Sequence, residues 1–251
     1  MGSMKISTVL FDLDGTLRFS DPPSIDTFHH HAETHGIQPD PESQRAARRW
    51  VFAYWANSDE LLEDIEIFGN HPDNVAFWTN YARKHLVILG GGESQAELLA
   101  PEITRIMQEQ YDPVGIVAVD TFDTLGKLKN EGYRMGVVSN RQDPIQEVIE
   151  ELNLQDYFEI TLAAGEVGWW KPDSRLLTYA AELMQAPPET IAYVGDNFYA
   201  DVISAEGAGM RAILVDPQGL FPEAECSVIR KLGELDGILN TNGRSRYSVV
   251  D

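Results

Sequence analysis

VLFDLDGTL, residues 9–17, is the stretch that decides the fold. It ends an apolar run, Ile6 to Phe11, that we interpret as a buried strand. Asp12 and Asp14 follow the run and, being two residues apart in an extended chain, point to the same side. Because open α/β sheets bind ligands at the carboxyl ends of their strands, we expect both carboxylates to face one pocket there.

Two carboxylates this close repel each other unless a cation or a shared proton relieves them. The pair of Asp12 and Asp14 therefore suggests a hard metal ion, together with a carboxylate that performs covalent or acid–base chemistry. The alternative is a solvated turn after a strand, because a short motif stays a hypothesis until its structural context supports it.

Composition limits the classes of partner. The 251 residues allow one large domain or two smaller ones, and a hydrophobic content of 43% suffices for a packed core. A formal net charge of -21 argues against nucleic acid and anionic membranes as partners, and we interpret it as a solvated surface. Cys226 is the only cysteine, which excludes an intramolecular disulfide. With no signal peptide and no membrane-spanning run in this sequence, we expect a cytoplasmic protein.

Helices alone are predicted from Asp21 to about Pro113. Asp21 is expected to cap the first helix, Ser58 to cap the third, and Pro101 to kink or break the fifth. A helical block of this size, inserted after one strand, indicates a separate domain. The five expected helices cover residues 22–36, 41–57, 58–68, 72–89 and 94–111.

Beyond Pro113 the pattern changes to alternating helices and strands, which predicts an α/β fold with a Rossmann-like, parallel, doubly wound sheet. The expected strands cover residues 134–139, 158–164, 191–195 and 212–215. The expected helices cover residues 121–132, 144–152, 172–184, 199–209 and 228–239.

Two polar sites suited to an anion follow these strands. Ser139 and Asn140 come directly after a buried strand, where a hydroxyl and backbone N–H groups suit a phosphate oxygen. Lys171 precedes Pro172, which suits the first turn of a helix, so that the ammonium and the helix dipole favour the same anion. Taken singly, the first is often an ordinary turn and the second a surface lysine.

A third site supplies more carboxylates. Asp196 follows the strand at 191–195 and would join Asp12 and Asp14 at the sheet edge. Three acids without a counterion are strongly unfavourable together, and Mg²⁺ with its oxygen ligands would resolve this. Asp201 suits a supporting position, pairing with Lys171.

Together and in this order, these signals resemble the haloacid dehalogenase superfamily of phosphohydrolases. That family carries DxDGT, a strand ending in Ser or Thr, a Lys, and GDxxxxD. The matching residues here are Asp12 to Thr16, Ser139, Lys171, and Asp196 with Asp201. The resemblance covers residues 4–20 and about 115–240, and the helical insert matches the family's cap in placement only. It implies a catalytic core of residues 4–20 and 114–240 and a helical cap domain of residues 21–113.

The resemblance also implies roles for these residues. Asp12 would be the nucleophile that forms an aspartyl-phosphate, and Asp14 the general acid and then the base that activates water. Mg²⁺ would bind the carboxylates of Asp12 and Asp196 and the backbone carbonyl of Asp14. Asp14 argues against the dehalogenase branch, which lacks this second acid. The phosphoryl oxygens would be held by Ser139, Asn140 and Lys171.

Several other residues have two interpretations. Arg18 and Arg141 are candidates for holding a substrate anion, with a solvated surface position as the alternative. Trp169 and Trp170 are expected to pack under neighbouring structure or to line the pocket rim. The group from His29 to His35 contains an i, i+4 pair compatible with a metal, and we interpret it as an exposed helix face.

The sequence thus predicts a Mg²⁺-dependent phosphatase that hydrolyses a small organic phosphate monoester through an aspartyl-phosphate. The alternatives are a phosphomutase of the same fold, acting on a sugar phosphate, and a non-catalytic regulatory or binding protein. The phosphorylated substrate and the oligomeric state are not predicted.

Overall fold

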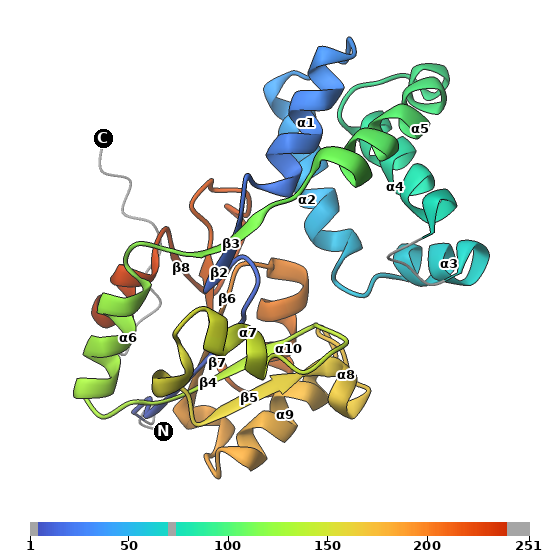
Figure 1. Ribbon diagram of the computed structural model, residues 1–251. Coiled ribbons are helices and arrows are strands. Elements are labelled where there is room, and N and C mark those ends of the chain that lie inside the picture. The colour runs from blue at the N-terminus through green and yellow to red at the C-terminus, as the bar shows by residue number, and fades with distance from the viewer. Residues whose placement is uncertain (1–4, 70–73, 240–251) are drawn as a thin grey trace. The chain divides into compact units, whose positions relative to one another are not determined.

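The computed structural model describes residues 5–69 and 74–239. It divides into two compact units, Met1–Phe19 with Ile116–Asp251, and Ser20–Gly115. The chain passes from one unit to the other through β2 (Arg18–Asp21) and β3 (Val114–Val117), which form a two-stranded sheet (Figure 1). Within the described residues, no helix has the length and apolarity needed to cross a membrane.

The first unit is built on a six-stranded sheet in the order β5-β4-β1-β6-β7-β8, and every pairing in it is parallel. This confirms the predicted Rossmann-like α/β fold. All four residues of β1 are buried, because a central parallel strand is covered on both faces. The strands are β1 (Thr8–Phe11), β4 (Arg134–Ser139), β5 (Ile160–Ala163), β6 (Ile191–Gly195), β7 (Arg211–Val215) and β8 (Ser227–Ile229).

Helices cover this sheet. Helices α6, α7 and α11 bury apolar side chains against the face formed by Val9, Phe11 and Val137, and α9 packs beside α10. The helices of this unit are α6 (Thr121–Asn130), α7 (Gln146–Glu151), α8 (Ala164–Val167), α9 (Ser174–Leu183), α10 (Ile203–Gly207) and α11 (Leu235–Leu239). Short 3₁₀ turns lie at η1 (Gln155–Tyr157), η2 (Pro188–Thr190) and η4 (Leu232–Glu234).

Three sequence predictions in this unit are wrong in detail. The helix expected over 228–239 begins only at Leu235, because Val228 lies in the edge strand β8. The helix expected from Pro172 begins at Ser174, where the Asp173 carboxylate caps it by accepting the N–H of Arg175. The helix expected from residue 199 opens as a π-helical turn, η3 (Phe198–Val202), before α10.

The second unit is helical, as the sequence pattern suggested. The prediction that Asp21 caps the first helix is wrong. Asp21 lies in β2, and Pro23 occupies the cap position. Ser58 caps the third helix as predicted, its Oγ accepting the Leu61 N–H at 3.1 Å. The helices in its described residues are α1 (Ser24–Thr34), α2 (Pro41–Tyr54), α3 (Asp59–Phe68), α4 (Val75–Ile88) and α5 (Glu93–Gln110).

Two prolines bear on the helix boundaries of this unit. Helix α5 runs through Pro101 without a break. Pro72, the expected start of the fourth helix, lies outside the described residues, and α4 begins at Val75 after an Asn74 cap. Aromatic side chains from α2 and α4 form a cluster around Tyr54 and Phe77.

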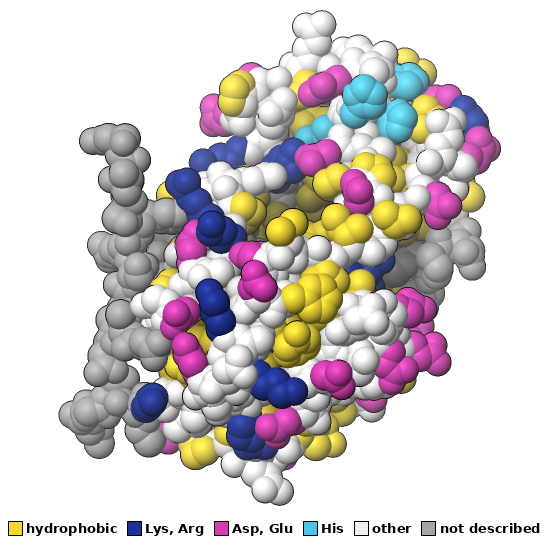
Figure 2. Space-filling model, turned by 60° about the vertical axis from the view of Figure 1, so that its left-hand side comes forward, with side chains coloured by type: hydrophobic (Ala, Val, Ile, Leu, Met, Phe, Trp, Pro, Cys, Tyr) yellow, Lys and Arg dark blue, Asp and Glu magenta, His cyan; other side chains and the backbone are white. Residues whose placement is uncertain are grey.

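The surface agrees with the interpretation of the acidity. On the face shown in Figure 2, acidic side chains are dispersed over the molecule and interspersed with lysine and arginine. A dispersed negative charge of this kind is typical of a solvated surface.

Candidate active site

The carboxyl ends of β1, β4 and β6 meet at one edge of the sheet. Phe11 pairs with Val137 on one side and Val194 on the other, so the three strands end within two residues of one another. The N–H of Asp12 continues the ladder to the Val194 carbonyl at 2.8 Å. The residues that follow these strands therefore gather where the sequence analysis expected them.

Lys171 lies at the centre of this edge and is buried. Its Nζ donates to Asp12 Oδ1 at 2.6 Å, to Asp201 Oδ1 at 2.7 Å and to Tyr193 Oη at 2.8 Å. All three ammonium protons therefore have an acceptor. Burial alone lowers the pKa of Lys171, but the carboxylates of Asp12 and Asp201 outweigh it and hold that pKa well above its ordinary value. The lysine stays charged, and its single positive charge is shared between the two carboxylates.

The side chain of Asn140 holds the main chain of Lys171. Asn140 Oδ1 accepts the Lys171 N–H at 2.7 Å, and Asn140 Nδ2 donates to the Lys171 carbonyl at 2.8 Å. The amide of Asn140 is therefore occupied by the backbone of Lys171. Ser139, at the end of β4, is buried beside this pair.

Three carboxylates come together beside the lysine, and Asp201 stands among them where the sequence analysis expected Asp14. Asp12, Asp196 and Asp201 each offer an oxygen, and these oxygens lie within 4.8 Å of one another. Burial, opposed by Lys171, raises the pKa of Asp12 to about 7, and burial with repulsion from Asp12 raises the pKa of Asp196 well above its ordinary value. Acids this close and this buried are the donor set that a hard divalent cation would stabilise.

Asp201 differs from the other two carboxylates. It lies in the π turn η3, with Oδ1 on Lys171 and Oδ2 accepting the Asn197 N–H at 2.8 Å. Because both oxygens are engaged by the protein, Asp201 is placed to hold Lys171 in position, as the sequence analysis expected.

Two glycines let the carboxylates approach the backbone. A Cβ on Gly15 would lie 2.1 Å from Asp196 Oδ2, and the backbone of Gly15 has a φ of +91°. A Cβ on Gly195 would lie 2.3 Å from the carboxylate of Asp201. Both positions therefore require glycine, the first for its φ and its space and the second for its space alone.

Asp14 lies nearer the surface, with 40% of its side chain exposed. Arg141 donates to both of its oxygens, from Nε at 2.7 Å and from Nη2 at 2.8 Å, and Arg18 Nη1 donates at 3.1 Å. The two arginines considered as anion ligands are thus paired with Asp14.

Tyr193 is the site residue that sequence reasoning missed. Its hydroxyl accepts from Lys171 and donates to the Val138 carbonyl at 2.9 Å. The only available signal was an aromatic residue within the otherwise small and aliphatic strand IAYVG. Burial and alternation place its ring inside but do not show what its hydroxyl contacts.

Other residues singled out from the sequence lie elsewhere. Trp169 packs edge-on against Tyr179, with ring centroids 6.1 Å apart. His30 and His35 are exposed on the helical unit, as expected, but the prediction is wrong for His29, which is buried with its ring against His85. Among the residues that the structure describes, the one group that could hold a metal is the aspartate cluster.

Comparison with known proteins identifies the family. The model of the haloacid dehalogenase-like hydrolase family matches residues 6–209. The chain belongs to the haloacid dehalogenase-like hydrolases. This confirms the family expected from the four motifs and makes the protein a hydrolase.

Relatives of this haloacid dehalogenase-like hydrolase include the human haloacid dehalogenase-like hydrolase domain-containing protein 3, 26% identical over 90% of this chain and 88% of that protein. The glyceraldehyde 3-phosphate phosphatase of Methanothermobacter thermautotrophicus is 37% identical over 45% of this chain and 50% of its own. The crystal structure of 2-haloacid dehalogenase from Pseudomonas syringae has a TM-score of 0.52 and 23% identity, covering 93% of this chain and 98% of that one. That last likeness concerns the fold alone.

Proposed function

We propose that this protein is a Mg²⁺-dependent phosphatase that hydrolyses small organic phosphate monoesters through an aspartyl-phosphate on Asp12. The observation that carries the proposal is the buried pair of Lys171 and Asp12, with a second acid, Asp14, two residues along the chain. A similar protein is named a glyceraldehyde 3-phosphate phosphatase, which supports a phosphate ester as the substrate class.

In the first step, the Asp12 carboxylate attacks phosphorus, an acyl-phosphate bond forms and the ester P–O bond breaks. Asp14 gives its proton to the departing alkoxide. In the second step, Asp14 takes a proton from water, the water oxygen attacks the phosphoryl group, and Asp12 and inorganic phosphate are released. Arginine N–H groups bond both oxygens of Asp14 in the structure, so one of them has to leave its oxygen before that oxygen carries the proton.

Phosphoryl oxygens are proposed to bind at Ser139, at the backbone of Asn140 and at Lys171. Because all three protons of Lys171 already have acceptors, a phosphoryl oxygen replaces one of them. Replacing Tyr193 Oη is the exchange that leaves both carboxylates paired, and the freed hydroxyl keeps its bond to the Val138 carbonyl. The charge on Lys171 is already fixed before the reaction, which is the condition for electrostatic stabilisation of the phosphoryl group.

Mg²⁺ would be held by the carboxylates of Asp12 and Asp196, with the Asp14 backbone carbonyl as the third protein ligand that the family pattern implies. When bound, the ion supplies positive charge that offsets the negative charge of the carboxylates and the phosphoryl group. Asp201 would stay outside the coordination sphere, since its oxygens are held by Lys171 and Asn197.

Hydrolysis of 4-nitrophenyl phosphate and of an alkyl phosphate, with Mg²⁺ or with EDTA, tests the proposal. Asp12→Asn should abolish phosphate release, whereas Asp123→Asn, the same change at an exposed carboxylate of α6, should leave it intact. Isomerisation of a sugar phosphate without free phosphate would replace the proposal with a mutase. Halide release from 2-chloropropionate without phosphatase activity would place the protein with the dehalogenases.

The helical unit is proposed as a cap domain, residues 21–113, that selects the organic part of the substrate. Its attachment through the two paired linker strands β2 and β3 supports a hinged domain. Replacement of this unit by a Gly/Ser linker should preserve hydrolysis of 4-nitrophenyl phosphate better than that of larger esters, provided that the shortened protein keeps a cooperative melt.

A further inference from the structure

The helical unit contains a cavity of about 490 Å³ that lies within its own helices. Residues from α1, α4 and α5 line it, together with Trp55 at the end of α2. The volume falls in the range of roughly 300–1,000 Å³ that small-molecule sites occupy. All of its lining residues belong to the unit Ser20–Gly115, so the cavity does not depend on the catalytic residues.

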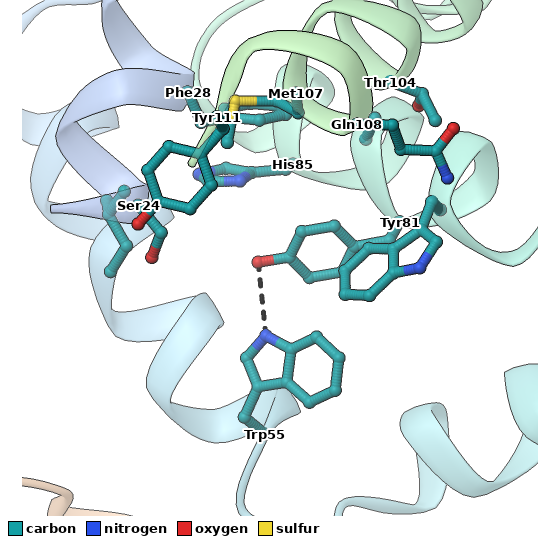
Figure 3. A pocket seen from close by; sticks show the side chains of 12 residues that line it. Ser24, Phe28, Trp55, Tyr81, His85, Thr104, Met107, Gln108 and Tyr111 are labelled. Atoms are coloured by element: carbon teal, nitrogen blue, oxygen red, sulfur yellow. Dashed lines mark hydrogen bonds between the residues drawn. The ribbon is translucent and has the colours of Figure 1, made fainter. Parts of the chain in front are cut away.

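Flat aromatic walls define the shape of this cavity. The rings of Phe28 and His85 are stacked, with centroids 4.1 Å apart and an angle of 1° between their planes. Trp55 and Tyr81 form another wall, joined by a hydrogen bond of 3.3 Å from the indole N–H to the hydroxyl (Figure 3). Walls made of ring faces and ring edges favour a flat, aromatic occupant over a saturated one of the same volume.

Two residues that line the cavity each have a buried polar atom that lacks a partner among the described residues. These atoms are Nδ1 of His85, a residue 1% exposed, and Oγ1 of Thr104, a residue 3% exposed. A threonine inside a helix can usually bond the carbonyl four residues earlier, yet this hydroxyl does not. Buried polar groups in folded proteins are nearly always paired, so each atom has room for one partner, which a ligand supplies once the side chain turns toward the cavity. The hydroxyls of Thr8, Thr16 and Thr121, outside the cavity, are unpaired as well.

His85 can serve a ligand as donor or as acceptor. Its Nε2 lies 3.0 Å from Nε2 of His29, so one ring donates to the other and the shared proton decides the tautomer of His85. Burial, together with repulsion from His29, lowers the pKa of His85 well below its ordinary value, so the ring is neutral near pH 7. Tyr81 adds a hydroxyl that Figure 3 shows directed toward the space between Ser24 and Trp55.

The uncharged lining of the cavity disfavours ions. No Asp, Glu, Lys or Arg lies among the described residues that line the cavity. Two acids of α3, Glu60 and Asp64, are both paired with Lys84. A cation or an anion in the cavity would therefore be desolvated without a counterion, which is costly.

We propose that the helical unit is a binding site for a flat, uncharged aromatic or heteroaromatic molecule that carries both a hydrogen-bond donor and an acceptor. The ring lies against Phe28, Trp55 and Tyr81, and the polar groups pair with His85 and Thr104. Two sources share this chemistry, the organic part of a phosphate ester and a separate small molecule. The binding itself does not depend on the proposed reaction.

Titration calorimetry on the full chain, with four matched compounds, tests the site. Benzamide has the ring and both polar functions, benzoate and benzylammonium add a charge, and cyclohexanecarboxamide lacks the aromatic ring. Benzamide should bind, with the charged compounds at least about tenfold weaker, because they bury an unpaired ion. Cyclohexanecarboxamide should also bind more weakly than benzamide.

Variants locate the binding. Thr104→Val removes only the hydroxyl and should weaken benzamide about two- to tenfold, the effect of one hydrogen bond. Ala82→Leu places a larger side chain in the cavity and should abolish binding. The control is Thr34→Val, the same threonine-to-valine change at an exposed position of α1, and it should leave the affinity for benzamide unchanged. A thermal melt of each variant shows that the fold is kept.

Three results would overturn the proposal. They are no binding of benzamide, equal affinity for benzamide in both cavity variants and the unmodified protein, or charged compounds that bind as tightly as benzamide. Competitive inhibition of 4-nitrophenyl phosphate hydrolysis by benzamide would support the site as the place of the substrate's organic part. Binding without competition would support a separate ligand. A failure of the phosphatase proposal would leave the calorimetry unaffected, so the two failures are distinguishable.

Discussion

Replacing Gly195 by alanine should destabilise the protein by disrupting the buried pair of Lys171 and Asp201. The new Cβ would lie 2.3 Å from the Asp201 carboxylate, about 1.2 Å short of the ~3.5 Å at which carbon contacts become favourable. The carboxylate cannot retreat freely, because Lys171 Nζ holds one oxygen at 2.7 Å and the Asn197 N–H holds the other at 2.8 Å. One of these bonds must therefore break.

The magnitude follows from two known costs. Overfilling a packed core costs about 1–3 kcal/mol, and separating a buried ion pair costs about 3–5 kcal/mol. Because the two costs relieve each other in part, we expect the free energy of unfolding of Gly195→Ala to fall by about 2–5 kcal/mol. Activity should fall as well, since Lys171 loses one of the two carboxylates that fix it.

Urea denaturation followed by circular dichroism measures the stability, and 4-nitrophenyl phosphate hydrolysis measures the activity. The control is Gly126→Ala in helix α6, where an added Cβ meets nothing within 4 Å and should stabilise by up to about 1 kcal/mol. In the double variant with Asp201→Ala, the cost of Gly195→Ala should shrink. The reasoning is refuted if Gly195→Ala stays within about 0.5 kcal/mol of the unmodified protein and keeps its activity.

Three further predictions concern the metal, the second acid and pH. EDTA should abolish activity and Mg²⁺ restore it, and Asp196→Ala should raise the Mg²⁺ concentration for half-maximal rate; full activity in EDTA would contradict this. Asp14→Asn should slow the hydrolysis of alkyl phosphates more than that of aryl phosphates, because an aryloxide leaves without a proton; an equal loss of rate for both classes would assign Asp14 another task. Burial, with repulsion from Arg48, lowers the pKa of His29 to about 4, so the contribution of His29 to stability should be full above pH 6.5 and fall by about 3 kcal/mol toward pH 4. The difference between the urea midpoints of the unmodified protein and of His29→Gln across that range measures this contribution, because the other titrating groups are common to both proteins.

The central strands could be predicted because their pattern is strong. Residues 134–139 and 191–195 match β4 and β6, since strands buried on both faces appear as continuous apolar runs. The short strands β2 and β3 could not be predicted, because they are partly exposed and exist through pairing with a partner more than 90 residues away. Strand β8 has three residues and depends on β7 in the same way.

The site could be predicted as far as strand ends allow. The meeting of Asp12, Ser139 and Asp196 follows from the rule that parallel strands end at one edge. The contact of Lys171 with Tyr193 could not be predicted, because an inward-facing tyrosine has the same pattern as any core aromatic residue. The bonds of Arg141 and Arg18 to Asp14 could not be predicted either, because the geometry of the loops, and not the spacing in the sequence, brings these residues together.

The complete hydrogen bonding of Lys171 also makes its amine chemically inert. Only a deprotonated amine attacks an acetylating reagent, and here the ammonium is buried, donates to three acceptors and has a pKa well above that of a free lysine. Exposed lysines such as Lys127 should be labelled within the time that leaves Lys171 untouched. An acetyl group on Lys171, detected by mass spectrometry, would therefore show that the site had opened before the reaction. Lys171 thus reports whether the site is intact.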